Sequence, residues 1–155
     1  MHLDTIFTII DEETCVGFSP LMFEKNDKVD VITYAKNNQR AVLHPTVKEL
    51  MKTIYPSMQF INCGNGISPF AQREQWTDGC NFVTVKPGVA YCYERNLKTL
   101  EAFKQIGFSI ISAKRILSEV YTLTDLEKTI ITIPSAELSR ARGGPHCMTF
   151  PISRF

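Results

Sequence analysis

The chain has 155 residues, of which 44% are hydrophobic and 21% charged, values typical of one globular domain with its own core. Its net charge of +1 provides no basic field for nucleic acid or an anionic membrane, and no apolar run approaches the roughly 20 residues of a membrane helix. The first residues carry acids and no basic region, unlike a signal peptide, so we predict one domain over 1–155 without a nucleic-acid or membrane partner.

Strand patterns dominate the first part of the chain, with one helix among them. The predicted strands alternate in polarity or contain β-branched residues, and they cover 3–10, 14–18, 29–35 and 59–63. The polar cluster at 36–39 is expected to end the third strand. Pro45 suits a first helical position, and the apolar residues between it and Pro56 fall on one helical face. A helix is therefore predicted from Pro45 to the residue before Pro56.

The second part of the chain follows a similar order. The predicted strands cover 80–85, 89–93, 108–112, 129–133 and 146–151. Residues 64–79 are expected to be irregular, and 86–88 (Lys-Pro-Gly) predicts a tight turn. Asn96 suits a helix N-cap and Gly107 the C′ position, so a helix is predicted between them. Residues 117–128 are ambiguous, and Ser135 is expected to cap a helical turn that reaches Arg140.

The order strand, strand, helix, strand recurs in two segments that share no sequence. One copy covers 14–63 and the other 80–112. This is weak support for a repeat, because the recurrence lies in the pattern alone. Mixed strands with helices on one side predict an α/β domain whose topology the pattern leaves open.

The five cysteines indicate a reducing environment. Their number is odd, their spacings are wide and no CxxC pair occurs, which argues against a disulfide framework and against a structural zinc site. We therefore expect free thiols and a cytoplasmic location. Four of the five stand in apolar stretches and are expected to be buried, whereas Cys147 stands in a glycine-rich loop.

The loop at 140–148 (RARGGPHCM) is the best candidate for a nucleophilic site. Two adjacent glycines permit a close backbone approach to a ligand, and Pro145 stiffens the segment before Cys147. Arg140, Arg142 and His146 place positive charge near the thiol, and positive charge favours the nucleophilic thiolate. A buried thiol at the start of a strand is the alternative interpretation of Cys147.

His2 and Asp4 form a second candidate constellation. Residues two apart on a strand point to the same face, so the imidazole and the carboxylate are expected to project together. Such a pair can divide a proton-transfer and substrate-binding task. It can also form half of a metal site completed by His146 or Cys147, and a frayed, functionless terminus is the third interpretation.

Other polar residues are assigned structural roles. The segment 72–79 contains the only tryptophan, and Glu74 is expected to pair with Arg73 or another neighbour and so to hold a loop. His44 is expected to end a strand or to cap a helix, and the pair Lys114-Arg115 to lie on a solvated face.

Taken together, these segments resemble the arginine deiminases. HLDTIFTIID, REQWTDGCN with KPGVAYCYERN, and ELSRARGGPHCM occur here in the order and rough spacing of that family. The resemblance covers nearly the whole chain and is weakest at 114–129, which resembles an insertion. It implies a pseudo-fivefold α/β propeller of ββαβ blades, of which 1–155 would be the C-terminal portion, about two blades. The N-terminal part would then be absent, or present as a separate chain.

The resemblance also implies a mechanism. Cys147 would attack the guanidinium carbon of L-arginine, and Asp4 would bind the guanidinium through two parallel hydrogen bonds. His2 would protonate the departing ammonia and then activate water, so that a covalent amidino-cysteine intermediate is hydrolysed to L-citrulline. Arg142 would contact the substrate or Asp4, whereas His146 receives no direct role. The resemblance implies neither a metal nor an organic cofactor.

Two departures from the family pattern matter. Ala141 replaces a glycine that is usual in the loop, which puts the usual loop geometry in question. The family's further guanidinium-binding aspartate, its nearby glutamate and its residues for the substrate carboxylate lie upstream of the segment present here. We therefore expect this chain alone to bind arginine poorly, because substrate positioning supplies a large share of any rate.

Three alternatives remain open at this stage. The chain could be an inactive remnant that acts as an oligomer or interaction module, because exposed strand edges favour self-association. A homo-oligomer is expected whether the chain is part of an enzyme or an inactive remnant. It could be a metal-binding domain that uses His2, Asp4, His146 and Cys147, although their spacing matches no known metal motif. It could also be a related guanidino hydrolase that acts on dimethylarginine or agmatine.

Overall fold

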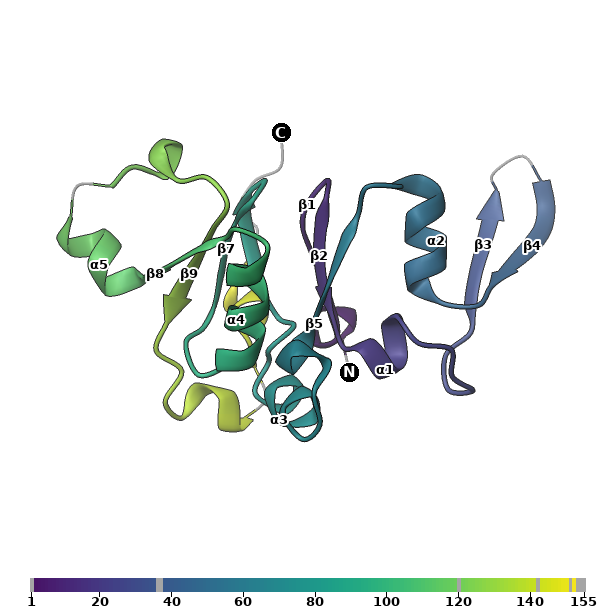
Figure 1. Ribbon diagram of the computed structural model, residues 1–155, viewed down its shortest axis with the longest axis horizontal. Helices are drawn as coiled ribbons and strands as arrows, with labels where there is room; N and C mark the ends of the chain where they lie inside the picture. Colours follow the sequence, from purple (N-terminus) through teal and green to yellow (C-terminus); the bar gives the residue numbers. More distant parts are fainter. Residues whose placement is uncertain (1, 36–37, 120, 142, 151, 153–155) are drawn as a thin grey trace.

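A computed structural model of the chain describes residues 2–35, 38–119, 121–141, 143–150 and 152, and it is a mixed α/β structure with several separate sheets (Figure 1). The first sheet has the order β1 (Phe7–Asp11), β2 (Thr14–Gly17) and β5 (Gln59–Asn62). A two-stranded sheet consists of β3 (Val31–Ala35) and β4 (Asn38–His44). A four-stranded sheet has the order β6 (Val83–Lys86), β7 (Val89–Tyr93), β9 (Thr129–Ile133) and β8 (Ser109–Ser112). The predicted α/β class is confirmed, and none of the sheets formed by the described residues closes into a barrel.

The first sheet departs from the predicted repeat unit at 14–63, because β3, its expected second strand, lies in the separate two-stranded sheet and β1 takes its place. β1 pairs antiparallel with β2, and β2 pairs parallel with β5, with Cys15 opposite Phe60. The crossover from β2 to β5 contains α1 (Ser19–Met22), the β3–β4 hairpin and α2 (Val47–Ile54). The hairpin projects from the far end of the molecule in Figure 1. The strand β4 was not predicted, because the polar cluster at 36–39 was interpreted as the end of strand structure.

The four-stranded sheet differs from the predicted repeat in one strand. β6 and β7 form the predicted antiparallel pair, and α4 (Leu97–Gln105) leads from β7 to β8. However, β9 lies between β7 and β8 and pairs parallel with both. The connection between β8 and β9 holds α5 (Ala113–Ser118) and the 3₁₀ turn η3 (Leu123–Asp125), in the segment where the resemblance is weakest.

A single apolar core joins the two larger sheets through α4. One buried cluster contains Ile10 and Val16 from the three-stranded sheet, Ala90 and Ile130 from the four-stranded sheet, and Phe103 from α4. The Phe103 ring lies between Phe82 and Phe108, with ring centroids 5.3 and 5.2 Å away. Full burial of one such side chain stabilises the fold by about 1.5–3 kcal/mol. A second cluster on the other face of the first sheet contains Cys15, Met22, Phe23 and Met58.

The boundaries of the helices depend on partners that lie outside each helix. Gly107 has a φ of 90° and follows α4 as predicted, and the amide of Phe108 donates to the carbonyl of Phe103, 3.1 Å away. Asn96 occupies the N-cap position of α4, but its side chain does not cap the helix. For α2 the cap is Thr46, whose hydroxyl accepts from the amide of Glu49, so the prediction that the helix starts at Pro45 was wrong by two residues.

Residues 64–79 are more regular than predicted. After the 3₁₀ turn η2 (Cys63–Gly66), the helix α3 (Phe70–Trp76) contains all four residues of the sequence REQW. The buried carboxylate of Glu74 in α3 accepts hydrogen bonds from the amides of Lys98 and Thr99, each 2.8 Å long. Glu74 therefore caps α4, and the structural role predicted for this motif is confirmed with a different partner.

Parts of two predicted strands near the ends of the chain are 3₁₀ turns instead: the start of the strand predicted at 3–10, whose remainder is β1, and the start of the one predicted at 146–151. Leu3–Thr5 forms η1, since the amide and hydroxyl of Thr5 both donate to the carbonyl of His2, 3.1 and 2.7 Å away. His146–Met148 forms η5, whose first turn follows Pro145 in a helical conformation, with φ −54°. The predicted turn before Arg140 is present as η4 (Leu138–Ala141). No helix within the described part of the chain is long and apolar enough to cross a bilayer.

Candidate active site

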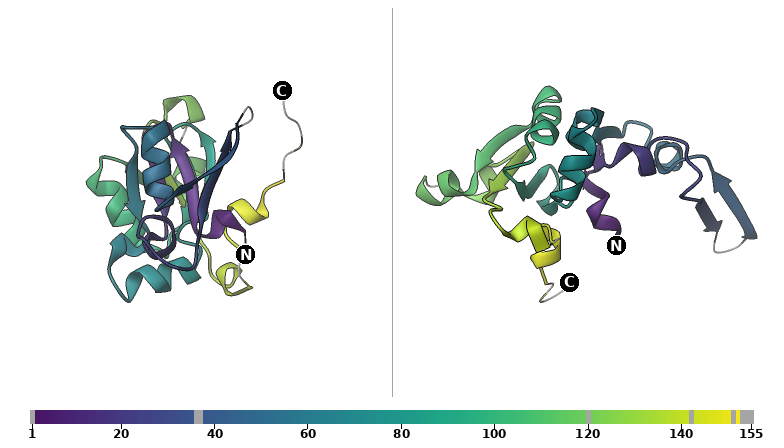
Figure 2. Two further views of the ribbon diagram at one scale, coloured as in Figure 1. Left: turned by 90° about the vertical axis from the view of Figure 1, so that its right-hand side faces the viewer. Right: turned by 90° about the horizontal axis from the view of Figure 1, so that it is seen from below.

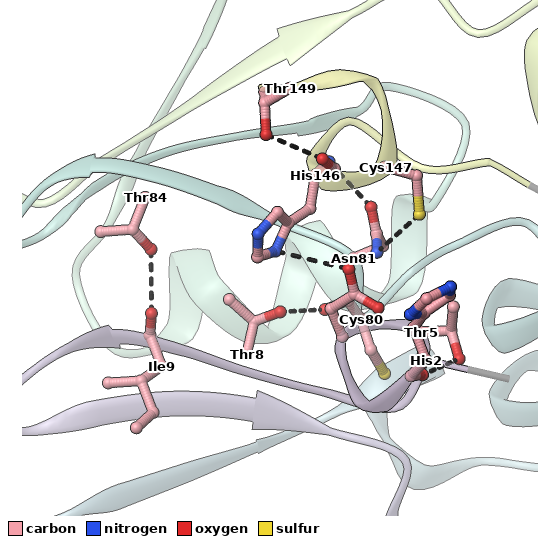
Figure 3. A network of polar contacts seen from close by, with 11 residues as sticks. His2, Thr5, Thr8, Ile9, Cys80, Asn81, Thr84, His146, Cys147 and Thr149 are labelled. Atoms are coloured by element: carbon pink, nitrogen blue, oxygen red, sulfur yellow. Dashed lines mark hydrogen bonds and ion pairs between the residues drawn. The ribbon is translucent and has the colours of Figure 1, made fainter. Parts of the chain in front are cut away.

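Two hydrogen bonds hold β1, the strand after the first turn η1, against the segment that begins at Cys80 and contains β6. The hydroxyl of Thr8 donates to the carbonyl of Cys80 over 2.6 Å, and the hydroxyl of Thr84 donates to the carbonyl of Ile9 over 2.9 Å (Figure 3). These two bonds connect β1 to the segment that contains β6. η1 directly precedes β1 in the chain, and both views of Figure 2 place η1 (purple) and η5 (yellow) on the same side of the molecule.

Asn81 connects this segment to the loop that carries Cys147. Its side chain is fully buried; Oδ1 accepts from the amide of His146 over 2.8 Å, and Nδ2 donates to Sγ of Cys147 over 3.5 Å (Figure 3). Gly144 makes the close approach possible, because a Cβ at this position would lie 2.1 Å from Oδ1 of Asn81. The glycine predicted to allow a close backbone approach therefore does so toward the protein itself.

Tyr93 supports the same loop from β7. Its buried hydroxyl donates to the carbonyl of Gly143 over 2.7 Å and lies 3.9 Å from Sδ of Met148. Burial, together with the nearby Asp78 and Cys147, raises the pKa of Tyr93, so the hydroxyl stays protonated and remains a donor. The loop is thus fixed on one side by Asn81 and on the other by Tyr93.

Asp4 faces His146 across the candidate site. Their Oδ2 and Nδ1 atoms are 3.6 Å apart, and their side chains are 22% and 52% exposed. Oδ1 of Asp4 is buried and accepts no hydrogen bond from a described residue. A cleft of about 540 Å³ opens beside the pair, and its lining includes Phe7, Phe82 and Thr149. A half-buried carboxylate with a free acceptor at a cleft is suited to binding a cationic donor.

The five cysteines differ in exposure as predicted. All are free thiols, four are buried and Cys147 is exposed. Burial, followed by the charge of Asp11, raises the pKa of Cys15 to about 12, and burial likewise raises the pKa of Cys80 and Cys92. These thiols are therefore held protonated, and the alternative that Cys147 is a buried structural thiol is wrong.

The remaining predicted site residues are His2, Arg140 and Arg142, and the structure describes the first two. The geometric argument for His2 and Asp4 on one strand face was wrong, because His2 precedes a 3₁₀ turn. The His2 ring makes no hydrogen bond or ion pair with any residue that the structure describes. Arg140 forms an exposed ion pair with Glu137, 2.8 Å long, and so brings little uncompensated charge to the thiol. Arg142 lies outside the described residues.

The metal-binding alternative finds no support in the arrangement of side chains. Within the described ranges, no group of three or more His, Cys, Asp or Glu side chains is placed to hold a metal ion. His146 instead uses its ring toward Asp4 and its backbone amide toward Asn81.

Sequence comparison decides the family of this chain. The family model described as arginine deiminase matches residues 1–154. This chain belongs to the arginine deiminase family. It is 34% identical over 154 residues to an arginine deiminase of Mycoplasma capricolum, and 34% identical over 161 residues to one of Latilactobacillus sakei. An arginine deiminase of Staphylococcus aureus is 31% identical over 159 residues.

The match covers nearly all of this chain but only part of its arginine deiminase relatives. In each of the three comparisons it includes 99% of this chain and 33–34% of the relative. The chain therefore spans about a third of the length of the curated relatives it matches. The matched third contains Asp4 and His146, which line the cleft, and Asn81 and Cys147, which contact each other.

Sequence reasoning missed two of the residues that build this site, Asn81 and Tyr93, and did not foresee the contact of His146 with Asp4. Asn81 stands inside the quoted motif REQWTDGCN, but nothing in its spacing pointed to Cys147. Tyr93 was interpreted only as part of a strand, and His146 was given no direct role. A polar side chain two residues after the Asp-Gly pair was the one available indication, and its partner became visible only in the fold.

Proposed function

We propose that this chain supplies the nucleophile and a guanidinium-binding carboxylate for the hydrolysis of L-arginine to L-citrulline and ammonia. The observation that carries the proposal is the free, buried acceptor of Asp4 beside the loop of the exposed thiol of Cys147. A guanidinium is planar, permanently charged and composed only of donors, so it matches a carboxylate that has an oxygen without a partner. Family membership supports the choice of arginine over other cations.

The proposed reaction has two halves. The thiolate of Cys147 attacks the guanidinium carbon, the carbon–sulfur bond forms, and the carbon–nitrogen bond breaks as His2 gives a proton to the leaving ammonia. Water then attacks the amidino-cysteine, His2 accepts its proton, and the carbon–sulfur bond breaks to release citrulline and the thiolate. Asp4 holds the guanidinium through both halves, and Arg142 contacts the substrate or Asp4.

The proposal includes an architecture. We take the sheet β1–β2–β5 and the sheet β6–β7–β9–β8 as about two blades of a pseudo-fivefold α/β propeller. The core that they share through α4, and the meeting of η1 with η5 between them, support this assignment. The other blades, with further groups for the substrate, would come from a part of the protein that corresponds to the remaining two thirds of the relatives. That part could be a separate chain, and the five free thiols support a cytoplasmic location.

A citrulline assay tests the proposal. We expect little turnover from the 155-residue chain alone, and turnover after mixing with the N-terminal two thirds of the Mycoplasma capricolum relative or fusion to it. The matched control is the same mixture with Cys147→Ser, which keeps the shape of the side chain but is a poor nucleophile. Turnover in the control would contradict the role of Cys147, and turnover of dimethylarginine or agmatine in preference to arginine would reassign the substrate.

The exposed hairpin favours a second candidate, an interaction or oligomerisation module. Ile32, Tyr34 and Leu43 on β3 and β4 are 45%, 74% and 68% exposed, although large apolar side chains gain from burial. Light scattering tests whether the chain forms a homo-oligomer. If the chain is inactive in every mixture but oligomeric, this second function replaces the first.

A further inference from the structure

We propose that Asn81 is a positioning residue that holds the thiolate form of Cys147 through its side-chain amide and fixes the turn of the nucleophile through its carbonyl. The inference rests on the proposed function in one respect, that Cys147 is the nucleophile. Its evidence is the pair of contacts from one fully buried side chain, 3.5 Å to Sγ of Cys147 and 2.8 Å to the amide of His146.

The orientation of the amide follows from its partners. The backbone amide of His146 can only donate, so the atom of Asn81 that faces it must be the carbonyl oxygen. The amino group is then left to face the sulfur, toward which it can only donate. A donor stabilises a thiolate more than a neutral thiol, because a hydrogen bond to a charged acceptor is the stronger one.

Because the side chain of Asn81 is buried, it is held in the orientation that directs its amide at Cys147. Asn81 has no exposed surface, and the backbone at Gly144 covers it so closely that a Cβ there would lie 2.4 Å from Cγ of Asn81. The side chain therefore cannot turn toward solvent without moving the loop. Since the amide of His146 adjoins Cys147, both contacts act on the same turn, η5. The other nearby donor, the hydroxyl of Tyr93, is already directed at the carbonyl of Gly143.

Alkylation by iodoacetamide measures the thiolate of Cys147 without arginine. The thiolate displaces iodide, a carbon–sulfur bond forms, and mass spectrometry locates the product. The four buried cysteines serve as internal controls, because they should stay unmodified while the chain is folded. The rate recorded against pH gives a midpoint at which half of the thiol is ionised.

Asn81→Ala removes the donor, and Asn81→Asp keeps an acceptor for the amide of His146 while presenting an anionic oxygen to the sulfur. We expect the midpoint to rise by about one pH unit in Asn81→Ala, the shift that corresponds to a tenfold lower thiolate fraction at neutral pH. In Asn81→Asp it should rise further. The rate near neutral pH should fall by about threefold to tenfold, since a more basic thiolate is also a better nucleophile.

Asn96→Ala is the matched control. Asn96 is also buried, and its amide bonds to the carbonyl of Thr77, so its loss should destabilise the fold without reaching Cys147. An unchanged midpoint in both Asn81 variants, or an equal rise in Asn96→Ala, overturns the proposal. If neither Asn81 variant folds, Gly144→Ala decides: its methyl group would displace the amide of Asn81, and an unchanged midpoint in that variant overturns the proposal.

The outcome is separable from that of the proposed function. A thiolate that depends on Asn81 in a chain that never forms citrulline, alone or in mixture, would contradict the arginine deiminase reaction and leave this inference in place. Citrulline formation with a thiolate that is indifferent to Asn81 would do the opposite.

Discussion

Asp4 and His146 approach to 3.6 Å between Oδ2 and Nδ1, although Asp4 belongs to the first turn, η1, and His146 to the last, η5. The contact is an ion pair only when the imidazole is protonated. It also occupies one oxygen of the carboxylate that we assign to the substrate guanidinium, while the other oxygen remains without a partner among the described residues. A bound guanidinium would have to replace the imidazole at Oδ2.

Asp4→Asn tests the guanidinium-binding role. The substitution keeps the shape of the side chain but removes its charge and replaces one acceptor by a donor that opposes the guanidinium. Loss of two charge-assisted hydrogen bonds, at about 1.5–3 kcal/mol each, should lower kcat/KM of the complemented enzyme by about 100-fold or more. The exposed Asp125, which bonds to Thr122 in a distant turn, gives the control Asp125→Asn. A decrease of less than about threefold for Asp4→Asn would exclude Asp4 from substrate binding.

Alanine substitutions at the adjacent glycines Gly144 and Gly143 should have opposite effects on the loop that carries Cys147. In Gly144→Ala the new methyl group would lie 2.1 Å from Oδ1 of Asn81, so the loop must move and the contacts of Asn81 with His146 and Cys147 should be lost. Overpacking of this kind costs about 1–3 kcal/mol of unfolding free energy. Urea denaturation and the alkylation rate of Cys147 should both change.

Gly143→Ala is the matched control, because a Cβ at Gly143 would meet no atom of the described residues within 4 Å, its chain neighbours aside. Its effect on unfolding free energy should stay within about 0.5 kcal/mol, as for an ordinary substitution in open space. Equal effects of the two substitutions would show that the close approach of Gly144 to Asn81 does not exist in solution.

Glu74→Gln tests the cap of α4. One oxygen of the Glu74 carboxylate accepts from the amide of Lys98, and the other from the amide and hydroxyl of Thr99, all at 2.8 Å. Glutamine can accept through only one oxygen, so a buried donor loses its partner, at a cost of about 1–3 kcal/mol in urea denaturation. Glu101→Gln on the same helix removes only an exposed ion pair with Lys98 and should cost under about 1 kcal/mol. If the two losses were equal, the cap would contribute nothing beyond a surface charge.

The buried thiols predict a loss of stability at alkaline pH. Burial raises the pKa of Cys15 from its ordinary value of 9.0 to about 12. Below about pH 9 both the folded and unfolded states keep this proton; above it the unfolded state releases the proton first, so stability falls as pH rises toward 12. Each such group contributes a slope of at most about 1.4 kcal/mol per pH unit.

Replacement of Cys15 isolates the contribution of this one thiol to the loss of stability at alkaline pH. Cys15→Ala should flatten the fall of unfolding free energy between about pH 9 and 11, whatever its effect at neutral pH, because one titrating group is removed. Ser118→Ala, at an exposed hydroxyl that does not titrate in this range, should leave the slope as in the wild type. Denaturant midpoints collected across this range give both slopes. A steeper or unchanged slope in Cys15→Ala would contradict the burial of that thiol.

Several elements could be predicted from local sequence because their causes are local. The strands β7 and β9 and the glycine after α4 were placed correctly, since β-branched and aromatic runs favour strands and a left-handed residue favours glycine. The prediction that the other four thiols are buried also follows from local polarity, whereas the exposure of Cys147 was left open. Motif order was enough to identify the family.

Other elements depended on partners elsewhere in the fold. Leu3–Thr5 has a strand-like composition, but the hydroxyl of Thr5 closes a turn on His2, and the pattern of apolar residues does not report that bond. β4 forms because β3 is available to pair with it, and β9 enters between β7 and β8 although α5 and η3 separate it from β8 in sequence. Strand pairing of this kind is non-local, so no window of sequence contains it.

The amino-acid sequence alone determined which groups this protein has for chemistry: a cysteine after a glycine-rich turn, and an aspartate and a histidine near the first residues. Only the tertiary structure decided which of them meet. It joined Asp4 to His146 and Asn81 to Cys147, because the bonds between β1 and the segment around β6 bring distant parts of the chain to one cleft. Residue types and local preferences are encoded position by position, whereas proximity between distant segments is a property of the packed core.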